Sequence, residues 1–229
     1  MGLLTFETPL SAAIEQQPSL IPLASRFGIR LGLGDKSIAA VCAEHRIDPD
    51  FMLALMNTYL FETYFPEQKL KSFHVSLIVD YLTKTNAYYL HSQLPNIERH
   101  LRSLISSGEG TNKHLELIGR FFEQFKASLT AAIAYDTEVW FPYCLALSSG
   151  ATPDREPRPA ELPAESEELA ASQLCDLRSI LVRHLSGTYD DNLAYAVIFA
   201  IGSIERDIRQ HNRIRNRILN PIIDALCRA

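Results

Sequence analysis

Apolar residues recur along most of this chain at alternating spacings of three and four positions, which is typical of one buried face of an α-helix. Runs that alternate between polar and apolar residues are nearly absent, so we expect essentially no β-strands. Long helices are predicted over residues 68–106, 112–147, 165–185 and 190–226, with a bend in the first near Leu94-Pro95. Four amphipathic helices of this length favour an up-down bundle. The expected fold class is therefore all-α.

A small helical domain is expected over residues 1–66. Asp48 is placed to cap a helix with Pro49 at its first position, and the segment 37–60 predicts helix, short turn and helix. DNA-binding proteins use this arrangement to place a helix in the major groove. The second helix, PDFMLALMNTYL, offers no Arg or Lys to phosphates and only Asn57 to a base edge. A packing domain is the favoured interpretation, and a transcriptional regulator is an alternative.

The residues 67–229 are expected to form the four-helix bundle. Between its second and third helices lies the stretch 148–164, which is rich in Pro, Ser and acidic residues and predicts a solvated linker.

Two of the predicted inward faces change from apolar to ionisable residues part of the way along. On the last helix His211 and Arg215 follow Ile208, and on the second helix Asp136 follows Ala132. An ionisable group on an inward face is costly unless it is paired or bound to a metal. The same spacing extends this polar level to the first and third helices, so that it comprises Asn86, Ala132, Asp136, Glu167, His211 and Arg215.

Three segments resemble hemerythrin-like domains of the iron–sulfur cluster repair type. They are FPEQKLKSFHVSLIVDYLTKTNAYYLHSQLPNIERHL, ASLTAAIAYDTEVWFPY and SIERDIRQHNRIRNRILNPII. The earlier RFGIRLGLGDKSIAAVCAEHRIDPDFMLALMN resembles the small helical domain that precedes the bundle in such di-iron proteins. The resemblance covers nearly the whole chain and implies a hemerythrin-like four-helix bundle. Its strongest anchors are framework positions, namely Leu94-Pro95, Trp140-Phe141-Pro142 and Leu219-Asn220-Pro221.

The resemblance also implies a ligand pattern, which this chain does not keep. Relatives hold two irons with a His from each helix and a Glu four residues after the His on the second and fourth helices, a set that suits iron. Here Asn86 stands at the first His position, and Ala132 and Asp136 stand for His and Glu on the second helix. The third helix has no His near Glu167.

On the fourth helix His211 is kept, but Arg215 stands where Glu is expected. We predict that Arg215 places its guanidinium where metal charge would be and forms a buried ion pair with Asp136, because the planar fork of Arg binds carboxylates bidentately. The alternative is that Arg215 lies off the inward stripe and extends to solvent. The small domain departs from the family as well, since relatives often carry a cysteine pair where this chain has Leu31-Gly32-Leu33-Gly34.

Composition narrows the function further. The net charge is -5, so nucleic acid and anionic membranes are not expected partners. No apolar run approaches the ~20 residues that span a bilayer, and the first residues lack the basic region of a secretory signal. None of the four cysteines is arranged as CxxC, so we expect small buried hydrophobes or thiols in a cytoplasmic protein.

Residue pattern and resemblance together predict a metal-free, non-enzymatic hemerythrin-like protein without a cofactor. It would act as a binding or regulatory module with a protein partner, in iron or in nitrosative and oxidative stress handling, and a homodimer is left open. The first alternative is a non-haem di-iron protein that aids iron–sulfur cluster repair, with an unusual ligand set of His211, Asp136 and Glu167. The second is the transcriptional regulator based on residues 37–60.

Overall fold

The computed structural model describes residues 2–108, 113–153, 157 and 164–228, without the side chains of residues 113 and 164–169. Most of these residues are helical, and the extended pairing among them is one isolated antiparallel bridge between Pro9 and Ser37. The all-α prediction is confirmed. A helix suited to crossing a bilayer is absent from the same residues.

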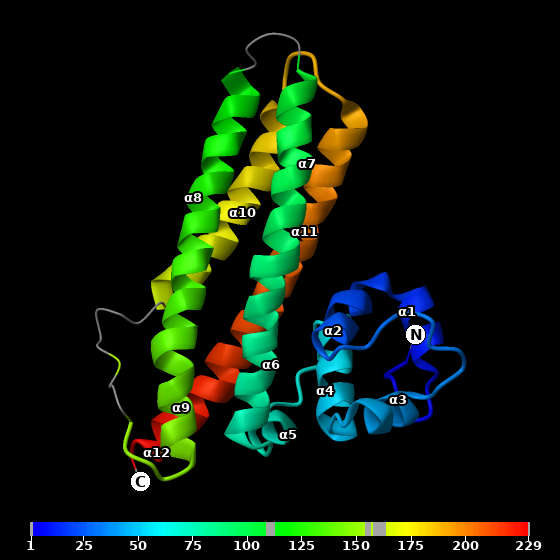
Figure 1. The fold of residues 1–229 in the computed structure, drawn as a ribbon, viewed down its shortest axis with the longest axis vertical. Coiled ribbons are helices and arrows are strands. Elements are labelled where there is room, and N and C mark those ends of the chain that lie inside the picture. Colours follow the sequence, from blue (N-terminus) through cyan, green and yellow to red (C-terminus); the bar gives the residue numbers. More distant parts are fainter. Residues whose placement is uncertain (1, 109–112, 154–156, 158–163, 229) are drawn as a thin grey trace. The chain divides into compact units, whose positions relative to one another are not determined.

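The chain divides into two compact units, residues 1–84 with 213–229 and residues 85–212, and the division falls within two helices. The boundary expected near residue 66 remains a prediction. The elements of the first unit, seen in Figure 1, are α1 (Leu10–Gln16), η1 (Pro18–Leu20), α2 (Ile21–Arg26), α3 (Ile38–His45), α4 (Pro49–Leu60), α5 (Glu67–Lys71), most of α6 (Val75–Tyr88), η5 (Arg215–Leu219) and α12 (Asn220–Leu226).

Local capping explains where the helices of the first unit begin. The Ser37 side chain accepts a hydrogen bond from the Ala40 N–H, and the Asp48 side chain accepts one from the Phe51 N–H, as expected for the caps of α3 and α4. Phe51 is fully buried and packs its edge against Tyr81, with ring centroids 6.1 Å apart. This aromatic pair ties α4 to α6 at the centre of the unit.

A buried guanidinium also lies in this first core. The Arg26 side chain is 6% exposed, and its Nη1 donates to the hydroxyl groups of Tyr59 at 3.2 Å and Tyr81 at 3.3 Å. The same guanidinium lies over the Tyr59 ring. The first unit therefore satisfies a buried charge with phenol oxygens and an aromatic face.

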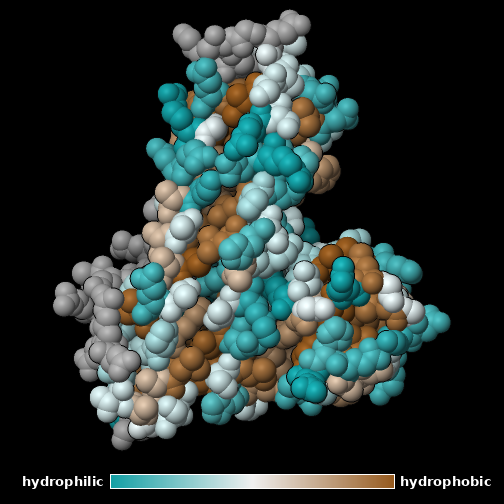
Figure 2. Space-filling view, viewed as in Figure 1, coloured by the Kyte–Doolittle hydropathy of each residue, from teal (hydrophilic) through white to brown (hydrophobic). Residues whose placement is uncertain are grey.

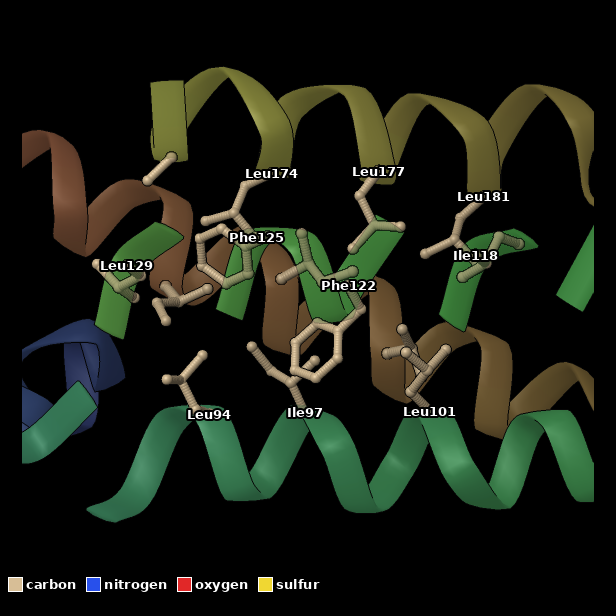
Figure 3. Packing of buried hydrophobic residues seen from close by; sticks show 14 of the residues in the cluster. Leu94, Ile97, Leu101, Ile118, Phe122, Phe125, Leu129, Leu174, Leu177 and Leu181 are labelled. Atoms are coloured by element: carbon tan, nitrogen blue, oxygen red, sulfur yellow. The ribbon is translucent and has the colours of Figure 1, made fainter. Parts of the chain in front are cut away.

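The second unit is built on long helices that share one apolar core. Its elements are η2 (Tyr89–Gln93), α7 (Leu94–Ser107), α8 (Lys113–Tyr135), η3 (Asp136–Trp140), α9 (Phe141–Ser148), α10 (Ala164–His184) and most of α11 (Asp191–Ile214). Figure 3 shows α7, α8 and α10 turning leucine, isoleucine and phenylalanine side chains toward one another, with Phe122 and Phe125 between the helices. The predicted inward residues of α10, Ala170, Leu174, Leu177 and Leu181, are all buried.

Charged residues at the surface of this unit connect its helices. Glu98 on α7 accepts from Lys126 on α8 at 2.8 Å, and this hydrogen bond holds the pKa of the carboxyl below its ordinary value and that of the amine above it. Glu205 on α11 is buried and accepts from Arg178 on α10 at 2.9 Å and from Arg209 at 2.6 Å. These pairs link neighbouring helices outside the apolar core.

The first long helix differs from the prediction at its start. Residues 68–71 belong to the separate short helix α5, and α6 begins only at Val75. His74 makes this break, since its Nδ1 accepts from the Ser76 N–H and contacts the Ser76 hydroxyl. A side chain that bonds the backbone in this way competes with continuation of a helix.

Three proline positions widen the helices rather than end them. The residues before Pro95, Pro142 and Pro221 each donate a backbone hydrogen bond five residues back, to Tyr89, Asp136 and Arg215 respectively, which closes a π-helical turn. A proline ring in a regular helix clashes with the carbonyl four residues earlier, and a wider turn relieves that clash. The helices therefore continue as α7, α9 and α12.

Two of these wide turns, η3 and η5, shift the buried face of the helix that follows. The regular spacing predicts Tyr143 inward on α9, yet Cys144 is fully buried and Tyr143 is only half-buried. On α12 the regular spacing predicts Ile222 and Leu226 inward, yet Ile223 is the buried residue and Leu226 is 40% exposed. Both predictions were wrong by one position because a π turn contains an extra residue.

Candidate functional site

A polar group interrupts the apolar core of the second unit where α6, η3 and α11 contribute side chains. Asn86 comes from the last turn of α6, Asp136 is the first residue of η3, and His211 lies near the end of α11. Their exposed fractions are 3%, 1% and 4%. These side chains, with Ala132 and Tyr89, line one cavity of about 10 Å³. The structure thus brings four of the six sequence-predicted positions around one point.

The contacts of the site are both polar and aromatic. Asn86 Nδ2 donates to Asp136 Oδ2 over a long 3.4 Å, and His211 Nδ1 lies 3.4 Å from Asn212 Oδ1. The edge of the Tyr89 ring meets the His211 ring with centroids 6.0 Å apart and an angle of 61° between the planes. A cavity of this volume holds about one water molecule. A substrate-sized molecule does not fit beside these side chains.

Two of the π turns begin at this level. Tyr89 opens η2 and Asp136 opens η3, so both residues are placed by wide turns that the following prolines require. Single π turns inside helices occur frequently at functional sites, because they re-aim side chains without breaking the helix. The prolines are visible in the sequence, where a proline within a helical pattern predicts a bend or a helix end.

The remaining two predicted positions are Arg215 and Glu167. Arg215 is 3% exposed, opens η5 and belongs to the first unit, whereas Asp136 belongs to the second. Its burial contradicts the alternative in which it extends to solvent, and the Arg215–Asp136 ion pair remains a sequence-based prediction. Glu167 falls within α10, but its side chain lies outside the described residues.

The described residues of the site do not fit a pair of irons. Around the cavity His211 provides one imidazole and Asp136 provides one carboxylate. The other two predicted positions provide only the methyl group of Ala132 and the amide of Asn86. Across the described side chains, no three His, Cys, Asp or Glu residues come together as metal ligands would. A di-iron centre needs several imidazoles and bridging carboxylates, and the described side chains around this cavity do not supply that set.

A search against family models and a search against curated proteins return no match to this chain.

The helix-turn-helix-like segment is closed to DNA at the residue that was expected to read a base. Asn57 is 2% exposed, its Oδ1 accepts from the Leu4 N–H at 2.8 Å, and its Nδ2 donates to the Leu4 carbonyl at 3.1 Å. Most of the other side chains of α4 are buried as well. This segment is a packing element of the first unit, and this observation counts against the transcriptional regulator.

A groove lies on the first unit at the loop Leu31-Gly32-Leu33-Gly34. It has a volume of about 360 Å³, and apolar and polar residues both line it: Ser11, Ile14, Glu15, Leu31, Gly32, Leu33, Gly34 and Asp35. Figure 2 shows apolar surface on this unit, at the right of the view. Leu31 is 67% exposed, and the loop contains no thiol. The groove therefore carries no cysteine chemistry.

The cysteines differ sharply in their surroundings. Among the described residues no disulfide is formed, Cys42 is buried in α3, and Cys227 is exposed. Burial, with a further contribution from the charge of Asp48, raises the pKa of the Cys42 thiol to about 11.

We expect Cys42 to stay unmodified by a thiol reagent at pH 8 in the native protein, because the thiolate is the reactive form, while Cys227 reacts rapidly. Mass spectrometry of alkylated peptides, with unfolded protein as the control, measures both rates. Comparable rates for the two cysteines in the native protein would contradict this expectation.

Proposed function

We propose that this chain is a hemerythrin-like protein whose metal centre has been lost and that it acts as a binding or regulatory module. The observation that carries the proposal is the buried group of Asn86, Asp136 and His211 around one small cavity. Buried polar residues persist in a core when they are remnants of a site or when they specify a structure. Their positions coincide with those that the resemblance assigns to iron ligands.

The small cavity supports a role that does not involve turnover of a substrate. A buried site with room for about one water gives no access to a substrate, and two of the ligand positions carry no ligating side chain. The function then lies in what the helices bind at their surfaces. The partner is a protein, the setting is the cytoplasm, and the context of iron or nitrosative and oxidative stress follows from the resemblance alone.

Metal analysis tests the proposal directly. The protein is produced in iron-replete cells, purified without chelator or metal-affinity tag, and measured for iron, zinc and manganese by mass spectrometry. The expected result is far less than one metal per chain and no near-ultraviolet oxo–iron band. About two irons per chain would overturn the proposal and establish the repair-type alternative, with ligands beyond those described around the cavity.

A further inference from the structure

The outward face of α11 exposes two large aromatic side chains one helical turn apart. Phe199 is 78% exposed and Tyr195 is 56% exposed. Aromatic side chains have much apolar area to bury and are enriched where proteins contact one another. Both residues lie in the second unit, on the helix drawn in orange in Figure 1. This face has no role in the polar site or in the core of its own chain.

A glycine follows the aromatic pair on the same face. Gly202 lies within α11, where glycine disfavours a helix relative to alanine. A Cβ atom added at this position would meet nothing within 4 Å, so packing inside the chain does not require glycine. Ser203 beside it is small and exposed. The helix surface therefore carries a projecting ring and, less than one turn away, a notch.

The spacing of this face is the same when it is read in either direction. Its members follow at intervals of three, four, three, four and three residues: Asn192, Tyr195, Phe199, Gly202, Arg206 and Arg209. An antiparallel second copy of the helix would therefore place like intervals opposite one another. Tyr195 of one copy would then face Arg206 of the other copy, and Phe199 would face Gly202 of the other copy. Because the two copies are equivalent, each of these contacts would occur twice in the dimer.

Charge along the face is complementary to itself in the same arrangement. Asp190 and Asp191 are exposed at the start of α11, whereas Arg206 and Arg209 are exposed toward its end. Arg209 is held in place by the buried Glu205, whose carboxylate also accepts from Arg178. Antiparallel pairing brings each acidic start near a basic end and places a guanidinium against the Tyr195 ring, which is a favourable cation–π geometry.

We propose that α11 is the contact surface of a symmetric homodimer, in which two copies pack antiparallel and Phe199 of each enters the notch at Gly202 of the other. Such an isologous contact is the commonest form of protein dimer. One helix face is smaller than the roughly 800 Å² per partner of a standard interface, so the dimer is expected to dissociate in the micromolar range. The proposal is independent of metal content.

Sedimentation velocity of the full chain from about 1 to about 300 µM tests the dimer, a range that brackets micromolar dissociation. The wild type is expected to shift from monomer to dimer across this range, and Phe199→Glu is expected to stay monomeric with an unchanged circular dichroism spectrum. Val182→Glu, at a 64% exposed position on α10, is the matched control and should dimerise as the wild type does. A wild type that is monomeric throughout, or a dimer that survives Phe199→Glu, overturns the proposal.

A compensating pair of substitutions tests the antiparallel register. Arg206→Glu alone should weaken the dimer at least ~10-fold, because the guanidinium that faces Tyr195 is lost and a carboxylate replaces it. Adding Tyr195→Lys to the same chain should restore association, since each new ammonium would face a new carboxylate of the other copy. If the double variant stays as weak as Arg206→Glu, the antiparallel register is wrong.

Discussion

Replacing Arg215 with Met is expected to lower the free energy of unfolding by about 3–5 kcal/mol, the loss typical of a broken buried ion pair. Asp136 is 1% exposed and Arg215 is 3% exposed, so neither charge can turn to bulk water without a rearrangement. If the two pair as the sequence predicts, the substitution leaves a carboxylate inside the protein without its cation. Urea denaturation followed by circular dichroism measures the loss.

Two further variants separate the ion pair from a general packing effect. Arg183→Met, at an exposed position on α10, should change stability by no more than about 0.5 kcal/mol. Combining Arg215→Met with Asp136→Leu should recover at least ~2 kcal/mol of the loss, because an apolar pair replaces an ionic one. A loss of less than about 1 kcal/mol for Arg215→Met, or no coupling between the two positions, would contradict the pair.

The polar positions could be located from the sequence because they break an otherwise regular pattern. Asp136 and His211 each follow several apolar residues at alternating spacings of three and four, and both lie inside the core of the second unit. Asn86 and Ala132 are less distinctive, since an amide or a methyl group is common on a helix. They were assigned to this level by extending the same spacing, and the structure places them at the same cavity.

The register beyond the polar level could not be predicted in the same way. Regular spacing assumes 3.6 residues per turn throughout, whereas η3 and η5 each insert one residue. Tyr143 and Leu226 were therefore assigned inward when their neighbours Cys144 and Ile223 are buried. The prolines that cause the wide turns were visible, but a proline in a helix predicts a break as readily as a π turn.

The outward face of α11 was missed for a different reason. An ionisable residue stands out in a sequence where it interrupts an inward apolar stripe, and Phe199 and Tyr195 fall outside that stripe. A single exposed aromatic residue on a helix is unremarkable. It is the exposed fraction of both rings and the open space at Gly202 that distinguish this face, and neither can be read from spacing alone.

Placing histidines at two lining positions is expected to create a metal site where the wild type has none of comparable strength. In the variant Asn86→His with Ala132→His, three imidazoles and the Asp136 carboxylate would surround the cavity that His211 already lines. This ligand set suits Co²⁺, Zn²⁺ or Fe²⁺. We expect Co²⁺ to bind this variant at least ~100-fold more tightly than it binds the wild type. The reason is that two imidazoles are added to the two ligands already present, His211 and Asp136.

Stability and spectroscopy report on the same variant independently. The added rings overfill a cavity of about 10 Å³ and should cost about 1–3 kcal/mol without metal. Co²⁺ should then raise the thermal midpoint of the variant but leave that of the wild type unchanged, since a ligand stabilises only the state that binds it. The visible d–d bands of the bound ion show whether nitrogen ligands surround it.

The control removes the imidazole that the natural chain already places at the cavity, that of His211. Adding His211→Gln to the two-histidine variant should abolish most of the gain in Co²⁺ affinity, because the site then lacks the ligand on α11. Ala132→His alone, a smaller change in the core, provides a second test if the two-histidine variant folds poorly. A folded variant that gains no affinity would show that these positions do not converge on one ligand point. Loss of a metal centre would then be the wrong explanation for the buried polar residues. The remaining explanation would be that these residues specify one arrangement of the helices in the core.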